Sequence, residues 1–428
     1  MEHLYPNQLA EFVYDSWPEK KNRPQLAVLE DLFSTCYQAS MLRHEGAHIS
    51  FRLLLDEPEN FPDEAGPPHG LHKLVFTEHA PITVNKLRRL SPAASFSRSL
   101  IGVRLDPQKG PLVWGIIHSG PRWLHAILGG RGHPPELPQS LLIKVTGPGV
   151  IEVARGDHTI AILSEGKIIG ESINVFQSKW LQDWMAPIRQ ERQELHLQAR
   201  EQADDDWADL EPDLTRTIEQ HLMRRILAAM RAYRLGGTLL IVPQELTETL
   251  TSHNPYLSIK YGFIEAEPRA RFRSLIINIM NKLAQIHKES KRPVTWQDYQ
   301  RSTDPEILAL DESIFEMSHL VSTLSTADGA VVLTKRFELL GFGAEIICES
   351  LDTQSIARAL DLEGTMTRRD SVNFFGSRHR SVYRFCDRLQ DTMAIVLSKD
   401  GSLQFVKWND GQLKYWEHQG SFDFSAIG

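Results

Sequence analysis

The sequence predicts an α/β protein with a mixed β-sheet flanked by helices in its C-terminal half. A β-rich α+β domain and a helical connector precede this half. In the first half, short apolar runs are separated by Gly, Pro and Asp turns, which is typical of antiparallel strands. In the second half, continuous apolar runs such as residues 238–242 follow helical repeats, which is typical of strands buried on both faces.

Length and composition restrict the class of protein. A chain of 428 residues exceeds what one core usually supports, so we expect a regulatory domain at 1–174, the connector at 175–210 and a second domain at 211–428. A net charge of −8 argues against general nucleic-acid binding. The three cysteines form no CxxC pair, and no signal peptide or run of eighteen apolar residues occurs. We therefore expect a soluble, cytoplasmic protein without membrane contact.

Helical spacing of apolar residues predicts an amphipathic helix at about 25–42, and a short helix is expected at 83–90. Alternation and turn residues predict eight strands in this half. Their expected ranges are 49–55, 71–76, 100–105, 112–118, 141–145, 150–154, 159–164 and 167–169.

One motif in this half resembles a zinc-protease pattern. His44-Glu45-Gly46-Ala47-His48 has the HExxH spacing, which places two imidazoles one helical turn apart for zinc. The pattern needs a continuous helix, whereas Gly46 interrupts it and a strand follows. No third ligand motif follows at a recognisable distance, so we favour a helix end leading into a strand.

In the second half, helical spacing predicts helices through the connector, from Leu214 to about Arg234, and at about 269–288 and 306–326. Gly236-Gly237 ends the helix that begins at Leu214 and precedes the buried strand 238–242. Further strands are expected at 330–333, 345–348, 393–397 and 403–407.

Two short motifs suggest phosphoryl-transfer chemistry. Gly376-Ser377-Arg378-His379-Arg380 places two guanidinium groups and a hydroxyl before a helix expected at 381–389, where free N–H groups can bind oxyanions. His379 could be a ligand, a phosphate donor or a filler. Asp328-Gly329-Ala330 offers a carboxylate that could hold a metal or activate a hydroxyl. Either motif alone is more often structural, because Asp-Gly turns and solvated arginines are common.

The order of these motifs is similar to that of the bacterial diadenylate cyclase domain, of the type found at the N-terminus of DNA-integrity scanning proteins. In that family, an Asp-Gly-Ala motif and a Gly-Thr-Arg-His-Arg motif form the active site. The resemblance also includes the strand at 237–242, the Leu-Leu-Gly-Phe-Gly-Ala segment at 339–344 and the closing hairpin at 393–407, and it covers roughly 211–416. The N-terminal half resembles, more loosely, sensor domains found with such modules.

The resemblance implies that two ATP molecules are condensed into cyclic di-AMP with release of pyrophosphate. It implies that Asp328 binds Mg²⁺ or Mn²⁺ and helps to deprotonate a ribose 3′-hydroxyl. Arg378 and Arg380 would hold phosphates, and His379 would assist at the phosphates or the metal. Ser377 stands in the place of the family's threonine.

The nucleotide-binding residues implied by the resemblance are Gly329, Ala330, Gly376 and Ser377, with a turn containing Leu340, Gly341 and Gly343 along the adenine. Each domain would hold one ATP, so two copies must meet face to face in a homo-oligomer. The alternative is a catalytically inactive sensor of ATP or a cyclic dinucleotide.

The chain departs from the family pattern in two longer segments. One segment precedes Asp328 and adds the helix at 269–288. The other is an insert at 348–375 with an expected helical piece at 353–362 and the basic pair Arg368-Arg369. These two segments could gate the site, block the apposition of two domains or create a new interface.

Overall fold

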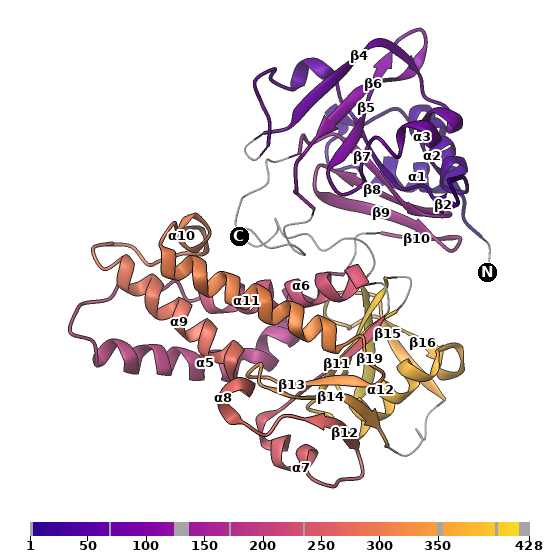
Figure 1. Ribbon diagram of the computed structural model, residues 1–428. Coiled ribbons are helices and arrows are strands. Elements are labelled where there is room, and N and C mark those ends of the chain that lie inside the picture. Colours follow the sequence, from indigo (N-terminus) through magenta and orange to yellow (C-terminus); the bar gives the residue numbers. More distant parts are fainter. Residues whose placement is uncertain are drawn as a thin grey trace. The chain divides into compact units, whose positions relative to one another are not determined.

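The computed structural model describes residues 3–67, 70–123, 137–170, 173–233, 236–348, 354–398 and 401–418. The chain divides into two compact units, Met1–Ser172 and Ile173–Gly428 (Figure 1). Each unit is built on its own large sheet, and the two are described separately below. The expected α/β class, with large mixed sheets flanked by helices, is confirmed.

The first unit contains an eight-stranded sheet in the order β10-β9-β8-β7-β3-β5-β6-β4. Only β3 and β5 pair in parallel, and the other neighbours are antiparallel. All eight expected strands are present. They are β3 Phe51–Leu55, β4 His72–Pro81, β5 Ser99–Asp106, β6 Gly110–His118, β7 Leu141–Gly147, β8 Val150–Arg155, β9 His158–Ser164 and β10 Lys167–Ile169.

Helices cover one face of this sheet. α1 (Pro6–Ser16) and α2 (Leu26–Ser40) direct Leu9, Leu29 and Phe33 into a core shared with the strands, and α3 (Val84–Leu90) contributes Leu87. Thr83 caps α3 by accepting a hydrogen bond from the Lys86 N–H. A smaller core around Trp114 covers the other face. The unit also contains two 3₁₀ turns, η1 (Lys20–Asn22) and η2 (Pro58–Asn60).

The HExxH segment is not helical. β1 (Arg43–His44) and β2 (Ala47–His48) form an exposed hairpin in which His44 pairs with Ala47. Glu45 and Gly46 occupy its turn with positive φ angles of 49° and 84°. The histidines therefore lack the one-turn helical spacing on which the zinc interpretation depends, and that interpretation is wrong.

The second unit contains a nine-stranded sheet in the order β12-β14-β13-β11-β17-β18-β19-β15-β16. The pairs β11–β13 and β15–β19 are parallel and the others antiparallel. The strands are β11 Gly237–Val242, β12 Leu257–Gly262, β13 Ala330–Thr334, β14 Leu339–Ile346, β15 Ser355–Ala359, β16 Thr367–Ser371, β17 Met393–Leu397, β18 Leu403–Asn409 and β19 Gln412–His418.

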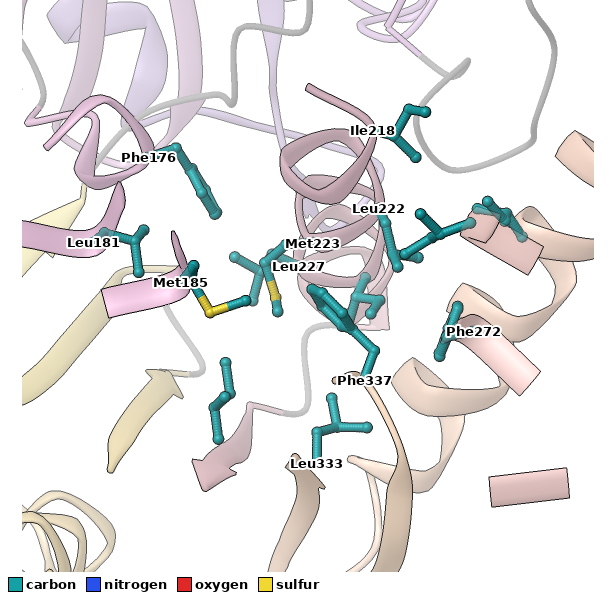
Figure 2. Packing of buried hydrophobic residues seen from close by; sticks show 14 of the residues in the cluster. Phe176, Leu181, Met185, Ile218, Leu222, Met223, Leu227, Phe272, Leu333 and Phe337 are labelled. Atoms are coloured by element: carbon teal, nitrogen blue, oxygen red, sulfur yellow. The ribbon is translucent and has the colours of Figure 1, made fainter. Parts of the chain in front are cut away.

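Helices lie on both faces of this sheet. One layer is formed by α5 (Lys179–Glu201), α6 (Leu214–Tyr233), α9 (Arg271–Ile286) and α11 (Pro305–Leu324) (Figure 1). Its apolar side chains share a core with Leu239 and Ile241 of β11. Figure 2 shows part of this core, with Met185, Leu222 and Phe272 from three of the helices. α12 (Ser377–Arg388) packs on the opposite face with Leu240 and Val242. Because β11 sends alternate residues to two cores, its sequence is continuously apolar.

Shorter elements connect these layers. They are η3 Val175–Gln177, η4 Gln244–Leu246, α7 Thr247–Thr251, α8 Ala266–Arg269, α10 Trp296–Arg301 and η5 Val372–Phe374. The expected connector at 175–210 contributes η3 and α5 to the core of the second unit.

Three local expectations for this unit were wrong. Leu340, Gly341 and Gly343 lie within strand β14 rather than in a turn, because β14 pairs with β13 on one side and β12 on the other. The expected helix at 353–362 contains strand β15, which pairs with β16 and β19. Residues 349–353 lie outside the described part of the chain. The helix expected from 381 begins four residues earlier, because Gly376 adopts an extended conformation and accepts the first helical hydrogen bond from the Arg380 N–H at 3.2 Å.

Candidate functional site

The Asp-Gly-Ala motif lies between the end of helix α11 and the start of strand β13. α11 starts at the Asp304 cap, which accepts hydrogen bonds from the Glu306 and Ile307 N–H groups, and it ends at Leu324. Four residues further on, Asp328 is exposed, and Ala330 opens the buried strand. The motif therefore presents its carboxylate to solvent from a turn anchored by buried structure on both sides.

Gly329 brings this turn against strand β14. Its φ is 107°, and a Cβ at this position would lie 2.5 Å from the carbonyl carbon of Gly343. Ala330 pairs directly with Ala344. Glycine is required here because the turn needs a positive φ and two backbones are in contact. Gly329, Ala330 and Gly343 are thus brought together.

An aromatic stack that the sequence analysis missed lies beside Gly343. Tyr261 of β12 has a ring carbon 3.1 Å from where a Gly343 Cβ would lie, and it stacks on Phe342 with centroids 4.8 Å apart at 22°. Tyr261 is 53% exposed. A Cβ on Gly341 would lie 2.5 Å from the Tyr261 carbonyl oxygen, so a side chain does not fit there. Leu340 is fully buried in the core. The open surface next to the turn is therefore aromatic.

The Gly-Ser-Arg-His-Arg motif forms the first turn of α12. Ser377, Arg378 and Arg380 are exposed, and His379 is half-buried. The N–H groups of Ser377, Arg378 and His379 precede the first helical hydrogen bond, so the turn has the donors of an anion-binding helix start. Arg378 and Arg380 are two positions apart, about 200° around the helix, so they leave it on different sides.

Aromatic side chains fix the start of α12. Phe375 meets Tyr383 and Tyr415 edge-on at centroid distances of 5.4 and 5.5 Å, and its ring is 5.9 Å from that of His379. The Tyr383 hydroxyl donates to Gln404 Oε1 at 2.9 Å, and the Tyr415 hydroxyl donates to Asp370 Oδ2 at 2.5 Å. Burial raises the pKa of both tyrosines far above the usual range, so both remain hydrogen-bond donors.

The elements that begin at the two motifs, β13 and α12, contribute side chains to the same core on one face of the sheet. Val382 and Tyr383 of α12 share a core with Ala330 and Ala344, and α12 contacts β14, β17, β18 and β19. In the described part of the chain, no group of three or more His, Cys, Asp or Glu side chains could hold a metal ion. Asp328 alone still fits Mg²⁺, because this ion is often held by one or two carboxylates together with substrate phosphates.

A second cluster, also missed from the sequence, lies at the opposite end of β13. Lys335 and Lys407 lie 4.4 and 4.6 Å from the ring centroid of Trp184, and Lys335 Nζ donates to Asp391 Oδ2 at 2.8 Å. Burial lowers the pKa of Lys407 to about 8, although Asp391 opposes the shift. An apolar pocket adjoins the cluster and is lined by Phe176, Met185, Met223, Phe337 and Lys335. Figure 2 shows the first four of these side chains.

The fold defines an α/β protein of two units, the second of which carries two exposed motifs that could bind an anion. Residues 18–118 match the family described as "Probable sensor domain DACNV", about a quarter of the chain. This match supports the expected N-terminal sensor domain. No curated protein matches the chain.

Among solved structures, one similar chain is described as the crystal structure of the hypothetical membrane spanning protein from Bacillus cereus. It shares 11% identity with a TM-score of 0.24, over 56% of this chain and 94% of that chain. In the described ranges of the present protein, none of the helices has the length and apolar character needed to cross a membrane.

Proposed function

We propose that this protein is a diadenylate cyclase that condenses two ATP molecules into cyclic di-AMP, regulated by its N-terminal sensor-type domain. The observation that carries the proposal is the close seating of the Asp328-Gly329 turn against Gly343, on the sheet face that also carries α12 with its two exposed arginines. The second unit thus offers a carboxylate and a helix start of the kind that binds phosphate.

The proposed reaction is a nucleotidyl transfer that occurs twice. The 3′-oxygen of one ATP forms a bond to the α-phosphorus of the other, and the bond from that phosphorus to the leaving pyrophosphate breaks. Asp328 accepts the proton of the 3′-hydroxyl. Arg378, Arg380 and the first N–H groups of α12 bind the phosphates, and the catalysis rests on positioning and charge neutralisation.

A divalent ion, Mg²⁺ or Mn²⁺, would be held by Asp328 together with the nucleotide phosphates, and it would neutralise their charge. His379, which is packed on Phe375, would orient a phosphate from the same helical turn. Tyr261, which stacks on Phe342 beside Gly343, would offer its ring to a nucleobase. Because one copy holds one ATP, two copies must oppose their sites.

The test is incubation of the full chain with ATP and Mg²⁺ or Mn²⁺, followed by chromatography for cyclic di-AMP. We expect product from the wild type and none from Asp328→Asn, which keeps the shape of the side chain but removes its charge. Glu345→Gln, an exposed carboxylate on β14, is the matched control and should retain activity. ATP binding without turnover, across metals and concentrations, would refute the cyclase and favour a nucleotide sensor.

Two further measurements test the roles within this proposal. Arg378→Ala should weaken ATP binding in calorimetry while leaving the thermal unfolding transition in place, because Arg378 is exposed. Unchanged affinity would remove the phosphate role. A variant that sediments as a monomer should lose activity at all concentrations, and retained activity there would contradict the face-to-face arrangement.

A further inference from the structure

Strand β3 of the sensor-type unit carries a buried charge. Arg52 lies between Phe51 and Leu53, and only 4% of it is exposed. Buried arginines are rare unless they are paired, because an unpaired charge away from water is costly. This position therefore needs an explanation beyond the packing of the sheet.

Two aromatic rings enclose the guanidinium group. Its central carbon lies 3.7 Å from the ring centroid of Phe96 and 3.7 Å from that of Trp123. Rings above and below leave only the edge of the guanidinium plane available to a partner. Within the part of the unit that the structure describes, neither Nε nor Nη1 of Arg52 donates a hydrogen bond. The two rings therefore fix the direction of the Nε and Nη1 donors of Arg52, and these two donors are unused among the described residues.

The nearest described acidic groups are engaged elsewhere. Arg52 pairs across the sheet with Lys144, and Lys144 pairs with Glu152 on the next strand. Glu152 Oε1 accepts hydrogen bonds from Lys144 Nζ at 2.6 Å and from Thr159 Oγ1 at 2.7 Å. Asp157 forms an ion pair with Arg122. The two carboxylates near Arg52 therefore form ion pairs with other residues, Glu152 with Lys144 and Asp157 with Arg122.

The electrostatics of this cluster are consistent with a missing anion. Burial and, to a smaller extent, neighbouring Arg122 lower the pKa of Arg52 to about 9, although Glu152 and Asp157 oppose the shift. Burial favours the neutral form of Glu152, but Lys144 and Thr159 hold its pKa at about 2, so it stays charged. These five described groups carry three positive and two negative charges. An added negative charge would balance them.

We propose that Arg52, clamped between Phe96 and Trp123, is the binding group for an oxyanion, carboxylate or phosphate, of a small ligand of the sensor-type unit. An oxyanion in the guanidinium plane would accept from the unused donors in charge-assisted hydrogen bonds. The two rings hold the guanidinium group in place before binding, which lowers the entropic cost of forming these bonds. Arg52 and Phe96 both lie within the residues that match the sensor family.

The test uses the full chain labelled with 5-fluorotryptophan and followed by ¹⁹F NMR, with the Trp123 line assigned by Trp123→Phe. Sodium acetate and inorganic phosphate are the probes, and sodium chloride keeps the ionic strength constant. We expect a saturable shift of the Trp123 line with one or both oxyanions and none with chloride. The line of Trp296, in the second unit, serves as the internal reference and should not move.

The two probes separate the possible ligand classes. Saturation by acetate alone assigns a carboxylate, and saturation by phosphate alone assigns a phosphate group. A shift that grows linearly with both anions, or no shift at all, would overturn the proposal and leave Arg52 as a ring-stacked structural cation.

Variants then locate the binding group. Arg52→Lys keeps the charge but loses the planar fork, and it should weaken anion binding by about tenfold or more, because hydrogen bonds between charged groups are lost. The matched control, Arg89→Lys, changes an exposed arginine in the same unit and should bind like the wild type. Wild-type affinity in Arg52→Lys would refute the proposal. If that variant does not unfold cooperatively, Phe96→Leu takes its place and should also weaken binding.

Discussion

Replacing Gly329 by alanine tests the seating of the Asp-Gly turn, on which the proposed site depends. The φ of 107° costs roughly 1–3 kcal/mol for a residue with a Cβ. The Cβ would also lie 2.5 Å from the Gly343 carbonyl carbon and 2.8 Å from the Ala344 nitrogen. These are backbone atoms that no side-chain rotation can move away, so the start of β13 must separate from β14.

The loss of one or two ladder hydrogen bonds adds about 1 kcal/mol each. We therefore expect Gly329→Ala to lower the free energy of unfolding of the second unit by about 2–5 kcal/mol. The matched control is Gly376→Ala, in the other motif. Gly376 has a φ of −64° and open space around its Cβ position, so the change should cost less than about 1 kcal/mol, the difference between glycine and alanine at a helix start.

The assay is urea denaturation of the full chain, with hydrogen–deuterium exchange of the peptides that cover β13 and β14. Faster exchange should appear in these two strands in Gly329→Ala and should be absent in Gly376→Ala. Equal, small losses of stability in the two variants would refute the reasoning. They would mean that the turn is not pressed against Gly343.

Three further predictions concern buried groups. The pKa of Lys407, about 8 in the folded protein against an ordinary 10.5, means that the unfolded chain binds more protons between these values. The free energy of unfolding should therefore rise with pH from about 8 to 10, by roughly 3 kcal/mol, and Lys407→Met should remove the rise in parallel denaturation curves. Asp311→Ala should cost about 3–5 kcal/mol in urea denaturation, because it leaves Arg225 charged and buried without the bond at 3.2 Å; a loss below 1 kcal/mol would contradict this. Burial raises the pKa of Cys36 above the usual range and that of Cys386 to about 12, so neither thiol should react with Ellman's reagent until the protein unfolds.

Local patterns were sufficient for most of the fold. The strands of the first unit were predicted because turn residues and alternation are readable within a few positions. β11 was predicted because a continuous apolar run after a Gly-Gly pair fits few other structures. The start of α12 was placed too late because its first turn, Ser377 to Arg380, contains no apolar residue with helical spacing.

Features that depend on distant segments could not be predicted. Ala357, Arg358 and Ala359 favour a helix locally, yet they form β15 because β19, more than fifty residues later, offers a strand edge. Tyr261 reaches Gly343 from more than eighty residues upstream. The sequence does carry a signal for the Arg52 cluster. Arg52, Lys144 and Glu152 are each a charged residue within an apolar strand, and they lie side by side on neighbouring strands.

The position of the insert bears on how the second unit could work. Its hairpin, β15 and β16, extends the sheet beyond β19, so that β11, β17, β18 and β19 separate it from β13. Five strand spacings of about 4.8 Å place β15 roughly 24 Å from β13 within the sheet. Asp370, on β16 of this hairpin, accepts a hydrogen bond from the Tyr415 hydroxyl. The Tyr415 ring in turn packs against Phe375 at the start of α12.

The described part of the insert is therefore built into the sheet on the side of the arginine motif, and not beside Asp328. Its connection to the site runs through Tyr415 and Phe375, the side chains that fix where α12 begins. A shift of this hairpin would move Arg378 and Arg380 relative to the sheet while leaving the Asp328 turn seated on Gly343. In the proposed cyclase, regulation through the insert would thus act on the arginines that bind phosphate before it acted on the carboxylate.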